Sequence, residues 1–332
     1  MRIAIGIDIG GTNTKYVLAQ EDGTVLSSYK KSTPISSDKT KTIEELMVDN
    51  LKEFLNTDSA KQVIDGISDS SSIAGIGIGI AGLIDRKSGN IIHSPNISAL
   101  NGVALKDIFE KEFSLPVVIE NDANIYAYGE KWVGAGKGYA NFAVITLGTG
   151  LGGGLIYNGE LYEGPMEIGH MVIVPSGRYC TCGSCGCLES YASGRAIVDS
   201  VVTALEKGTE SLLSKCCDGN IYKITPEIVY QTALEGDNLS REAFRDLGQF
   251  LGIGISNLMN ILDLEAVIIG GGLLGAWDLF IEKVNKEASK RAFKPLSSVP
   301  VLKSSLTENA GSIGAAGFLF SKIASSPAGA SQ

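Results

Sequence analysis

Short runs of β-branched residues alternate with amphipathic helical segments along almost the whole chain. Strands are expected over residues 3–9, 15–19, 73–80, 117–120, 143–147, 155–157 and 266–269. Helices are expected over residues 43–55 and 105–113, from Asp122 to about Trp132, and along the apolar stripe Phe244, Leu247, Leu251, Leu258 and Ile261. Alternating strands and helices are typical of an α/β fold, and 332 residues are enough for two domains.

The charge balance argues against polyanionic partners. There are 28 Lys and Arg residues against 37 Asp and Glu, which gives a net charge of −9. Nucleic acid and anionic membranes repel so acidic a chain, so neither is expected as a partner. The longest apolar run, residues 73–84, contains glycines and is shorter than the roughly 20 residues that cross a bilayer. Since no secretion signal is visible either, we expect a cytoplasmic protein whose six cysteines are reduced or metal-bound.

Glycine-rich turns follow three of the expected strands. Residues 8–15 (Asp-Ile-Gly-Gly-Thr-Asn-Thr-Lys) place a carboxylate, backbone N–H groups, a hydroxyl and an ammonium within one turn. Nucleotide phosphates with Mg²⁺ require such groups, although a plain hairpin with a Gly-Gly turn would explain the same residues. The loop Gly148–Gly154 and the run Gly270–Gly272 favour the phosphate interpretation. Residues 7–12 and 146–150 share a strand–turn–strand pattern, but this similarity is too short to establish a duplication.

Two stretches match the dinucleotide fingerprint G-x-G-x-x-G, at residues 77–82 and 148–153. The fingerprint requires a helix directly after the loop, and turn or hairpin residues follow both stretches instead. A nicotinamide or flavin enzyme is therefore not expected. The sequence also lacks a Walker lysine motif, which excludes a P-loop enzyme.

Polar side chains gather at the end of the strand expected over residues 117–120. Residues 120–124 (Glu-Asn-Asp-Ala-Asn) stand where that strand is followed by a helix. A helix N-terminus stabilises a carboxylate, so Asp122 would stay ionised and could accept a proton from a hydroxyl. Asp122 could equally serve only as the cap of the helix, and both interpretations stay open at this point.

His170, one of only two histidines, precedes a dense group of cysteines. Four of the eight residues from Cys180 to Cys187 are cysteines: Cys180, Cys182, Cys185 and Cys187. Thiolates this crowded would oxidise or repel one another unless a soft cation held them, and one histidine with three cysteines makes a closed tetrahedral zinc site. A reactive thiol cluster and a four-cysteine site without the histidine are the alternatives.

Taken together and in this order, the motifs resemble the ROK family (repressor, open reading frame, kinase), and within it the glucokinase branch. The patterns D-x-G-G-T, S-P-N, E-N-D-A-N, G-T-G-x-G-G-G, E-x-G-H and C-x-C-G-x-x-G-C-x-E occur at residues 8–12, 94–96, 120–124, 148–154, 167–170 and 180–189. Residues 309–316 are similar to the family's closing helix, so the resemblance covers nearly the whole chain.

The resemblance implies the actin-like ATPase (ribonuclease H-like) fold, in which two α/β domains flank a cleft that holds Mg-ATP. The small domain would comprise residues 1–119, with a C-terminal helix over about 311–326 packing back on it. The large domain would comprise residues 120–310 and carry the zinc-binding loop. The family also implies a homodimer or a homotetramer.

The resemblance further implies roles for individual residues. Asp122 would be the catalytic base toward the 6-hydroxyl of a hexose. The sugar would be bound by Asn96, Asn121, Asp122, Glu167, His170 and Glu189. Mg-ATP would be bound by Asp8, Gly10, Gly11, Thr12, Lys15, Thr149, Gly150, Gly271 and Gly272. A structural zinc would be held by His170, Cys180, Cys182 and Cys187, while Cys185 occupies a variable position of the pattern, although a ligand swap stays open.

The implied function is an ATP-dependent hexose kinase that phosphorylates glucose. Fructose, N-acetylmannosamine and N-acetylglucosamine are alternative substrates because related kinases share these residues, and polyphosphate is an alternative donor. A sugar-responsive transcriptional regulator is the alternative from another class. Such regulators carry a basic DNA-binding segment ahead of the first strand, which is expected here from residue 3, so a kinase is favoured.

Overall fold

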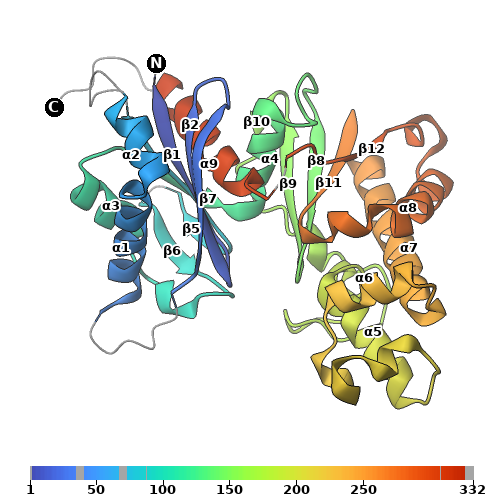
Figure 1. Cartoon of the computed structure of the whole chain (residues 1–332). Coiled ribbons are helices and arrows are strands. Elements are labelled where there is room, and N and C mark those ends of the chain that lie inside the picture. The colour runs from blue at the N-terminus through green and yellow to red at the C-terminus, as the bar shows by residue number, and fades with distance from the viewer. Residues whose placement is uncertain (1, 35–40, 67–72, 87, 307, 326–332) are drawn as a thin grey trace. The chain divides into compact units, whose positions relative to one another are not determined.

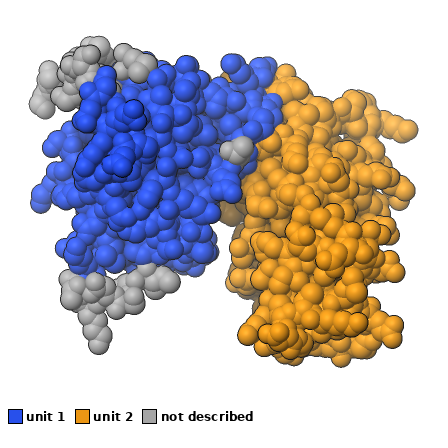
Figure 2. Space-filling model, viewed as in Figure 1, with its two compact units in different colours: residues 1–138, 305–332 blue, residues 139–304 orange. Residues whose placement is uncertain are grey.

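A computed structural model describes residues 2–34, 41–66, 73–86, 88–306 and 308–325 (Figure 1). The chain divides into two compact units: unit 1 comprises residues 1–138 and 305–332, and unit 2 comprises residues 139–304 (Figure 2). The division expected after residue 119 falls inside strand β7 (Val117–Asn121), which pairs with β4 (Ile73–Ile80). Strand pairing therefore keeps β7, and the helix that follows it, in unit 1.

Unit 1 contains a five-stranded sheet in the order β3-β2-β1-β4-β7. Strands β1, β4 and β7 run parallel, whereas β2 lies antiparallel between β1 and β3. The remaining bounds are β1 (Ile3–Ile9), β2 (Asn13–Gln20), β3 (Val25–Ser32), α1 (Ile43–Leu55), α2 (Asp58–Asp65), the hairpin β5 (Leu83–Asp85) and β6 (Asn90–His93), α3 (Leu105–Phe113), α4 (Asp122–Val133) and α9 (Ala310–Ser325).

Unit 2 contains a second five-stranded sheet, in the order β10-β9-β8-β11-β12. Its longest helix, α7, has 24 residues and packs with α8 against β8 and β11. In the described parts of the chain, no helix combines the length and the apolar character that a membrane span requires. The bounds are β8 (Phe142–Leu147), β9 (Leu151–Tyr157), β10 (Glu160–Leu161), α5 (Gly194–Glu206), α6 (Pro226–Leu234), α7 (Asn238–Ile261), β11 (Ala266–Gly270), α8 (Trp277–Arg291) and β12 (Val301–Lys303).

The two sheets have the same topology. In each, the first strand pairs antiparallel with the second and parallel with the fourth, the second pairs antiparallel with the third, and the fourth pairs parallel with the fifth. The similarity between residues 7–12 and 146–150 therefore marks corresponding turns, β1–β2 and β8–β9. It was too short to carry weight in the sequence, yet it reflects a repeated supersecondary unit.

The expected strands and helices are present, and two of the differences in extent concern predicted motifs. The glycine loop expected over residues 148–154 is shorter, because residues 151–154 pair with β8 as the start of β9 and leave only residues 148–150 in the turn. The closing helix α9 begins at Ala310 and ends at Ser325, and residue 326, its expected end, lies outside the described residues.

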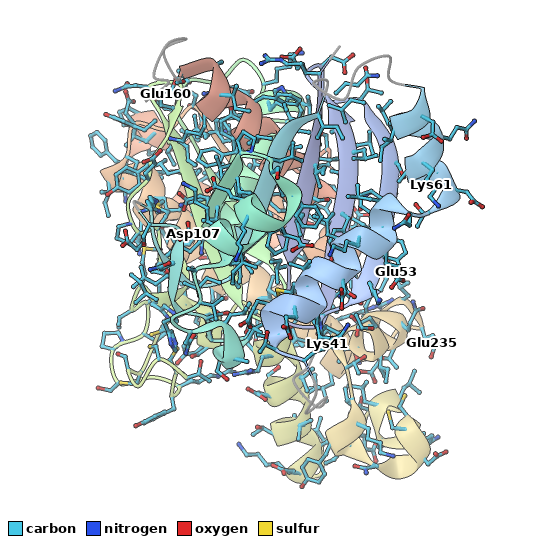
Figure 3. The ribbon with its side chains drawn as sticks, turned by 90° about the vertical axis from the view of Figure 1, so that its left-hand side faces the viewer. Lys41, Glu53, Lys61, Asp107, Glu160 and Glu235 are labelled. Carbon is cyan, nitrogen blue, oxygen red and sulfur yellow. The ribbon has the colours of Figure 1, made fainter. Side chains whose placement is uncertain are left out.

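Helix α1 is fixed by the cap predicted for it. Thr42 accepts a hydrogen bond from the Glu45 N–H, and the Glu45 side chain accepts one from the Thr42 N–H, which together form a capping box. Near the end of the helix, Glu53, which is labelled in Figure 3, accepts hydrogen bonds from Tyr29 and Lys31 of β3. These contacts join α1 to the edge strand as well as to the core.

Glycines in β1 and β4 allow α9 to approach the sheet. Helices α1 and α3 cover one face of the unit 1 sheet and α9 covers the other (Figure 1). A Cβ on Gly77 would lie 1.9 Å from the Ala315 backbone oxygen, and one on Gly6 would lie 1.9 Å from that of Ser312. The isoleucines that alternate with the glycines of β4 belong to the core with α1 and α3. Gly77 therefore serves helix packing, in agreement with the rejection of a dinucleotide loop.

We predict that Gly77→Ala lowers the free energy of unfolding by about 1–3 kcal/mol, because the added methyl group would overlap the backbone of α9. Gly275→Ala is the matched control, since a Cβ there meets nothing within 4 Å. Urea unfolding followed by circular dichroism should lower the midpoint only for Gly77→Ala. Equal midpoints would contradict the close packing of α9.

Candidate active site

The register of the unit 1 sheet brings the ends of three parallel strands to one level. Asp8 of β1 lies beside Gly79 of β4, which lies beside Glu120 of β7. In open α/β sheets, ligands bind at the edge where the carboxyl ends of parallel strands meet. The turn that follows β1 and the helix that follows β7 therefore begin at the same edge.

The turn between β1 and β2 offers backbone donors. The Gly10 N–H donates to the Asn13 backbone oxygen at 3.1 Å and closes the turn. Gly11 and Thr12 are exposed, and their N–H groups have no partner among the residues that the structure describes. Successive unpaired N–H groups in a tight turn form a concavity that binds anions. This geometry favours the phosphate interpretation of residues 8–15 over a plain hairpin.

Asp8 is buried at this edge, close to Asp122 and to helix α9. Burial, and then the negative charge of Asp122, raises the pKa of Asp8 to about 6, while Lys15 acts in the opposite direction. A Cβ on Gly311 would lie 2.5 Å from Asp8 Oδ2, so the first turn of α9 lies against the carboxylate. Lys15 Nζ donates to the Glu308 backbone oxygen at 2.6 Å. Asp8 thus lies against the first turn of α9, and Lys15 bonds to the residues just before that helix.

Asn121 caps helix α4, so the interpretation of Asp122 as the cap is wrong. The Asn121 side-chain oxygen accepts hydrogen bonds from the N–H groups of Ala123 at 2.9 Å and Asn124 at 3.3 Å. Its amide nitrogen donates to the Gly82 backbone oxygen at 3.1 Å. Asp122 is the first residue of the helix, and its carboxylate accepts from the Ala123 N–H at 2.9 Å. The Asp122 carboxylate therefore lies at the positive end of the helix dipole.

A buried carboxylate, Glu120, supports the residues that precede Asp122. Its side chain is 2% exposed, and Arg86 Nε and Nη2 donate to its two oxygens at 2.7 and 2.9 Å. The Asn121 N–H and the Asn124 amide add hydrogen bonds at 2.9 and 3.0 Å. A carboxylate with four donors is held firmly, so Glu120 orients the backbone from which Asp122 projects. Sequence reasoning assigned Glu120 no role and missed Arg86, which is 34 positions away in a turn without a motif.

The turn between β8 and β9 in unit 2 is built in a similar way. The Gly148 N–H donates to the Gly150 backbone oxygen at 3.0 Å. At the start of α5, the N–H groups of Gly194 and Arg195 donate to the backbone oxygens of Gly148 at 2.9 Å and Thr149 at 3.3 Å. The N–H groups of Thr149 and Gly150 have no partner within the described parts of the chain. This turn too presents two unpaired N–H groups suited to phosphate.

Two further predicted positions lie beside this turn. Glu189 Oε2 accepts a hydrogen bond from the Leu151 N–H at 2.8 Å, which ties the cysteine-rich segment to the start of β9. A Cβ on Gly271 would lie 2.3 Å from the Leu147 backbone oxygen, so the glycine run packs against the end of β8. Around Gly272 a Cβ would meet nothing within 4 Å. The glycine run therefore leaves open space next to the turn.

The cysteine-rich loop depends on glycines with left-handed backbone. Gly183 and Gly186 have φ angles of +93° and +78°, and a Cβ on Gly186 would lie 1.9 Å from the Val174 backbone oxygen. The Cys180 N–H donates to the Ser184 backbone oxygen at 2.9 Å. These turns fold the chain back on itself and explain why glycines stand at both positions of the cysteine motif.

His170, Cys180, Cys182 and Cys187 form the one group of potential metal ligands found among the described residues. Their ligand atoms all lie within 4.8 Å of one another. Cys180 Sγ lies 3.7 Å from His170 Nδ1, and Cys182 Sγ lies 3.7 Å from Cys187 Sγ. Ligands about 2.3 Å from a zinc ion at tetrahedral angles would be about 3.8 Å apart, so the donor set fits zinc. Cys185 is not part of the group.

Cys180 and Cys187 differ in how readily they ionise. Burial opposes ionisation of Cys180, but hydrogen bonds, first from the Cys182 backbone, outweigh it and lower the pKa of this thiol to about 7. Burial and the neighbouring thiols Cys180 and Cys182 raise the pKa of Cys187 to about 12. One thiolate thus suppresses the next, and a bound metal ion would remove this conflict.

The predicted site residues fall into two groups, one in each unit. Asn96 belongs to the first, because a Cβ on Gly11 would lie 3.0 Å from Asn96 Cβ. Glu167 belongs to the second, where it is exposed and precedes the short 3₁₀ helix Ile168–His170. The first group is Asp8, Gly10, Gly11, Thr12, Lys15, Asn96, Asn121 and Asp122, and the second is Thr149, Gly150, Glu167, His170, Cys180, Cys182, Cys187, Glu189, Gly271 and Gly272.

Comparison with known proteins identifies the family. The model of the ROK family matches residues 4–322. The chain belongs to the ROK family. A glucokinase from Streptomyces coelicolor is 35% identical over 327 residues, which cover 95% of this chain and 97% of that protein. A xylose repressor from Caldicellulosiruptor bescii is 34% identical over 293 residues, which cover 87% of this chain and 70% of the repressor.

A solved structure of a ROK protein confirms the fold. The crystal structure of a ROK family glucokinase from Streptomyces griseus, in complex with glucose and AMPPNP, has a TM-score of 0.78 to this chain at 34% identity. The match covers 95% of this chain and 98% of the other. The predicted actin-like ATPase fold is therefore confirmed, and the repeated sheet topology is in keeping with it.

We predict that Arg86→Met lowers the free energy of unfolding of this ROK protein by about 2–4 kcal/mol, because it leaves the buried Glu120 charge unpaired. Adding Glu120→Gln should recover part of the loss, since a neutral amide leaves no buried charge. Lys52→Met, which removes an exposed ion pair with Glu112, should cost less than about 1 kcal/mol. Urea unfolding of the single and double variants measures these differences, and additive effects of Arg86→Met and Glu120→Gln would contradict the coupling.

Proposed function

We propose that this chain is an ATP-dependent kinase that transfers the γ-phosphate of ATP to the 6-hydroxyl of glucose, with Asp122 as the general base. The observation that carries the proposal is the position of Asp122, a carboxylate at a helix N-terminus, on the same sheet edge as the β1–β2 turn. The similarity to glucokinases at 34–35% identity supports glucose as the acceptor.

Phosphoryl transfer depends mainly on positioning and on neutralising charge. The unpaired N–H groups of the two turns would bind phosphate oxygens of ATP, and Asp8 would hold the Mg²⁺ that accompanies the nucleotide. Mg²⁺ supplies charge neutralisation on the phosphates when bound. Asp122 would accept the proton of the 6-hydroxyl as that oxygen bonds to the γ-phosphorus, while the bond from the γ-phosphorus to the β–γ bridging oxygen breaks and ADP leaves.

Recognition of a hexose requires several hydroxyl partners with fixed directions. Asn96, Glu167 and His170 would supply an amide, a carboxylate and an imidazole. Asn121 retains one amide hydrogen after its bond to Gly82, and Glu189 retains one carboxylate oxygen after its bond to Leu151. Because Asn121 and Glu189 are already held by the protein, a wrong epimer would leave a polar group unpaired once the sugar covers it.

We also propose that His170, Cys180, Cys182 and Cys187 hold a structural zinc ion. The support is the donor set, with its 3.7 Å separations, and the opposed pKa shifts of Cys180 and Cys187. Zinc would brace the segment between His170 and Glu189, both of which are proposed to contact the sugar.

A kinase accounts for more of the site than a sugar-sensing repressor does, although repressors share the family. Two turns with unpaired N–H groups and a carboxylate at a helix N-terminus suit phosphoryl transfer, which sugar sensing alone does not require. Fructose, N-acetylmannosamine, N-acetylglucosamine and polyphosphate remain as outcomes of the test below.

We predict that ADP release, measured in a coupled assay with ATP, is faster with glucose than with fructose, N-acetylmannosamine or N-acetylglucosamine. Asp122→Asn should lower kcat at least about 100-fold, because the amide cannot accept the hydroxyl proton, while the melting temperature stays near that of the wild type. Higher kcat/KM with another sugar would reassign the substrate, and preferred use of polyphosphate would reassign the donor.

Two outcomes of this assay would count against the assignment. Normal turnover by Asp122→Asn with an unchanged melting temperature would remove Asp122 as the base. No turnover with any of the four sugars and either donor, by wild-type protein that binds glucose in calorimetry, would favour a sensing role.

We predict that one equivalent of zinc copurifies with the protein and that Cys182→Ala loses it, because three ligands do not close a tetrahedral site. Sugar affinity should fall with the metal, since the segment from His170 to Glu189 would no longer be held. Cys185→Ala is the matched control and should keep both the zinc ion and the sugar affinity. Elemental analysis and calorimetric titration with glucose measure the two effects, and active enzyme without metal would contradict the proposal.

A further inference from the structure

We propose that Thr33 is a positioning residue for ATP: it fixes the β1–β2 turn so that the Gly11 N–H faces the nucleotide phosphates. This inference rests on the proposed assignment of that turn to the phosphates. Thr33 is 5% exposed and directly follows Ser32, which pairs with Asn13 in the β2–β3 ladder. The ladder therefore brings Thr33 beside the turn.

Thr33 anchors the turn at two points. Its hydroxyl donates to the Gly10 backbone oxygen at 2.6 Å, and its N–H donates to the Thr12 backbone oxygen at 2.9 Å. In a trans peptide the C=O and N–H groups point in opposite directions. Because the Gly10 carbonyl points toward Thr33, the Gly11 N–H on the same peptide points away from it. That N–H is one of the two donors left without a partner among the described residues.

A second hydroxyl fixes the direction of this hydrogen bond. Thr14 Oγ1 lies 3.0 Å from Thr33 Oγ1, and Thr14 is 1% exposed. Each hydroxyl has one hydrogen, and that of Thr33 is used for Gly10. Thr14 must therefore donate to Thr33, and the Thr33 hydroxyl cannot rotate away without leaving buried groups unpaired.

The turn in unit 2 achieves the same orientation by a different device. There the Gly148 and Thr149 carbonyls accept from the N–H groups of Gly194 and Arg195 at the start of α5, so the Thr149 and Gly150 N–H groups point the other way. In the topologically matching turn of unit 1, Thr33 anchors the Gly10 carbonyl, which orients the Gly11 N–H, and the Thr12 carbonyl, which shares its peptide with the Asn13 N–H. In each turn, therefore, an anchored carbonyl directs an unpaired N–H of the same peptide away from the anchor.

The test compares four variants of the full-length protein in steady-state kinetics and in calorimetric titration with AMPPNP. Thr33→Val keeps the shape and the N–H but removes the hydroxyl, and we expect KM for ATP and Kd for AMPPNP to rise about five- to tenfold, with KM for glucose unchanged. Thr33→Ser keeps the hydroxyl and should restore both constants. If Thr33→Val does not fold, Thr33→Ala makes the same comparison.

Two further variants separate the possible causes. Thr232→Val removes a buried hydroxyl that bonds to the Ile228 and Val229 backbone oxygens in unit 2, and should lower the melting temperature without changing nucleotide affinity. Thr12→Val tests the phosphate assignment itself.

Weakened binding in Thr12→Val with wild-type affinity in Thr33→Val would overturn only the role of Thr33. Wild-type affinity in both would overturn the assignment of the turn. Equal losses of ATP and glucose affinity in Thr33→Val would reduce Thr33 to a structural role and overturn the proposal.

Discussion

The parallel register of β1, β4 and β7 determines where chemistry can occur in unit 1. It sets Asp8, Gly79 and Glu120 side by side, so that a turn with free N–H groups and a helix N-terminus begin at one edge. A shift of one residue in either ladder would move the carboxylates to the opposite face of the sheet. The tight contact of Gly6 in β1 and Gly77 in β4 with α9 resists such a shift, because only glycine fits under the helix backbone at these two positions.

Sequence reasoning predicted the elements whose signals are local. The capping box of α1, the hairpin of β1 and β2 and the glycine-rich strand β4 each carry their pattern within a few residues, and each is present. Edge strands β3 and β12 were missed because β3 is largely polar and β12 has only three residues. The boundary of the first unit was misplaced because strand pairing and the return of α9, not composition, decide which residues belong together.

In the candidate site, too, sequence reasoning found the residues with local motifs and missed those that act through distant contacts. The residues of the phosphate turns and the cysteine group could be predicted because glycines and thiols stand close together in the chain. Arg86 and Thr33 could not, since each acts on a partner more than twenty positions away through a single bond that leaves no motif. The capping role of Asn121 and not Asp122 was also undecidable, because adjacent polar residues suit the cap equally and only backbone geometry distinguishes them.

The return of α9 has a consequence for how the protein is made. Unit 2 is one continuous stretch, residues 139–304, and can form its core as soon as that stretch has left the ribosome. Unit 1 needs residues from both ends of the chain. The helix that begins at Ala310 packs against Gly6, Gly77 and Asp8, so their packing is complete only after that helix has been synthesised. The first half of the protein to be synthesised is therefore the last to be completed. A chain that ended before Ala310 would lack the helix that packs against Gly6, Gly77 and the Asp8 carboxylate.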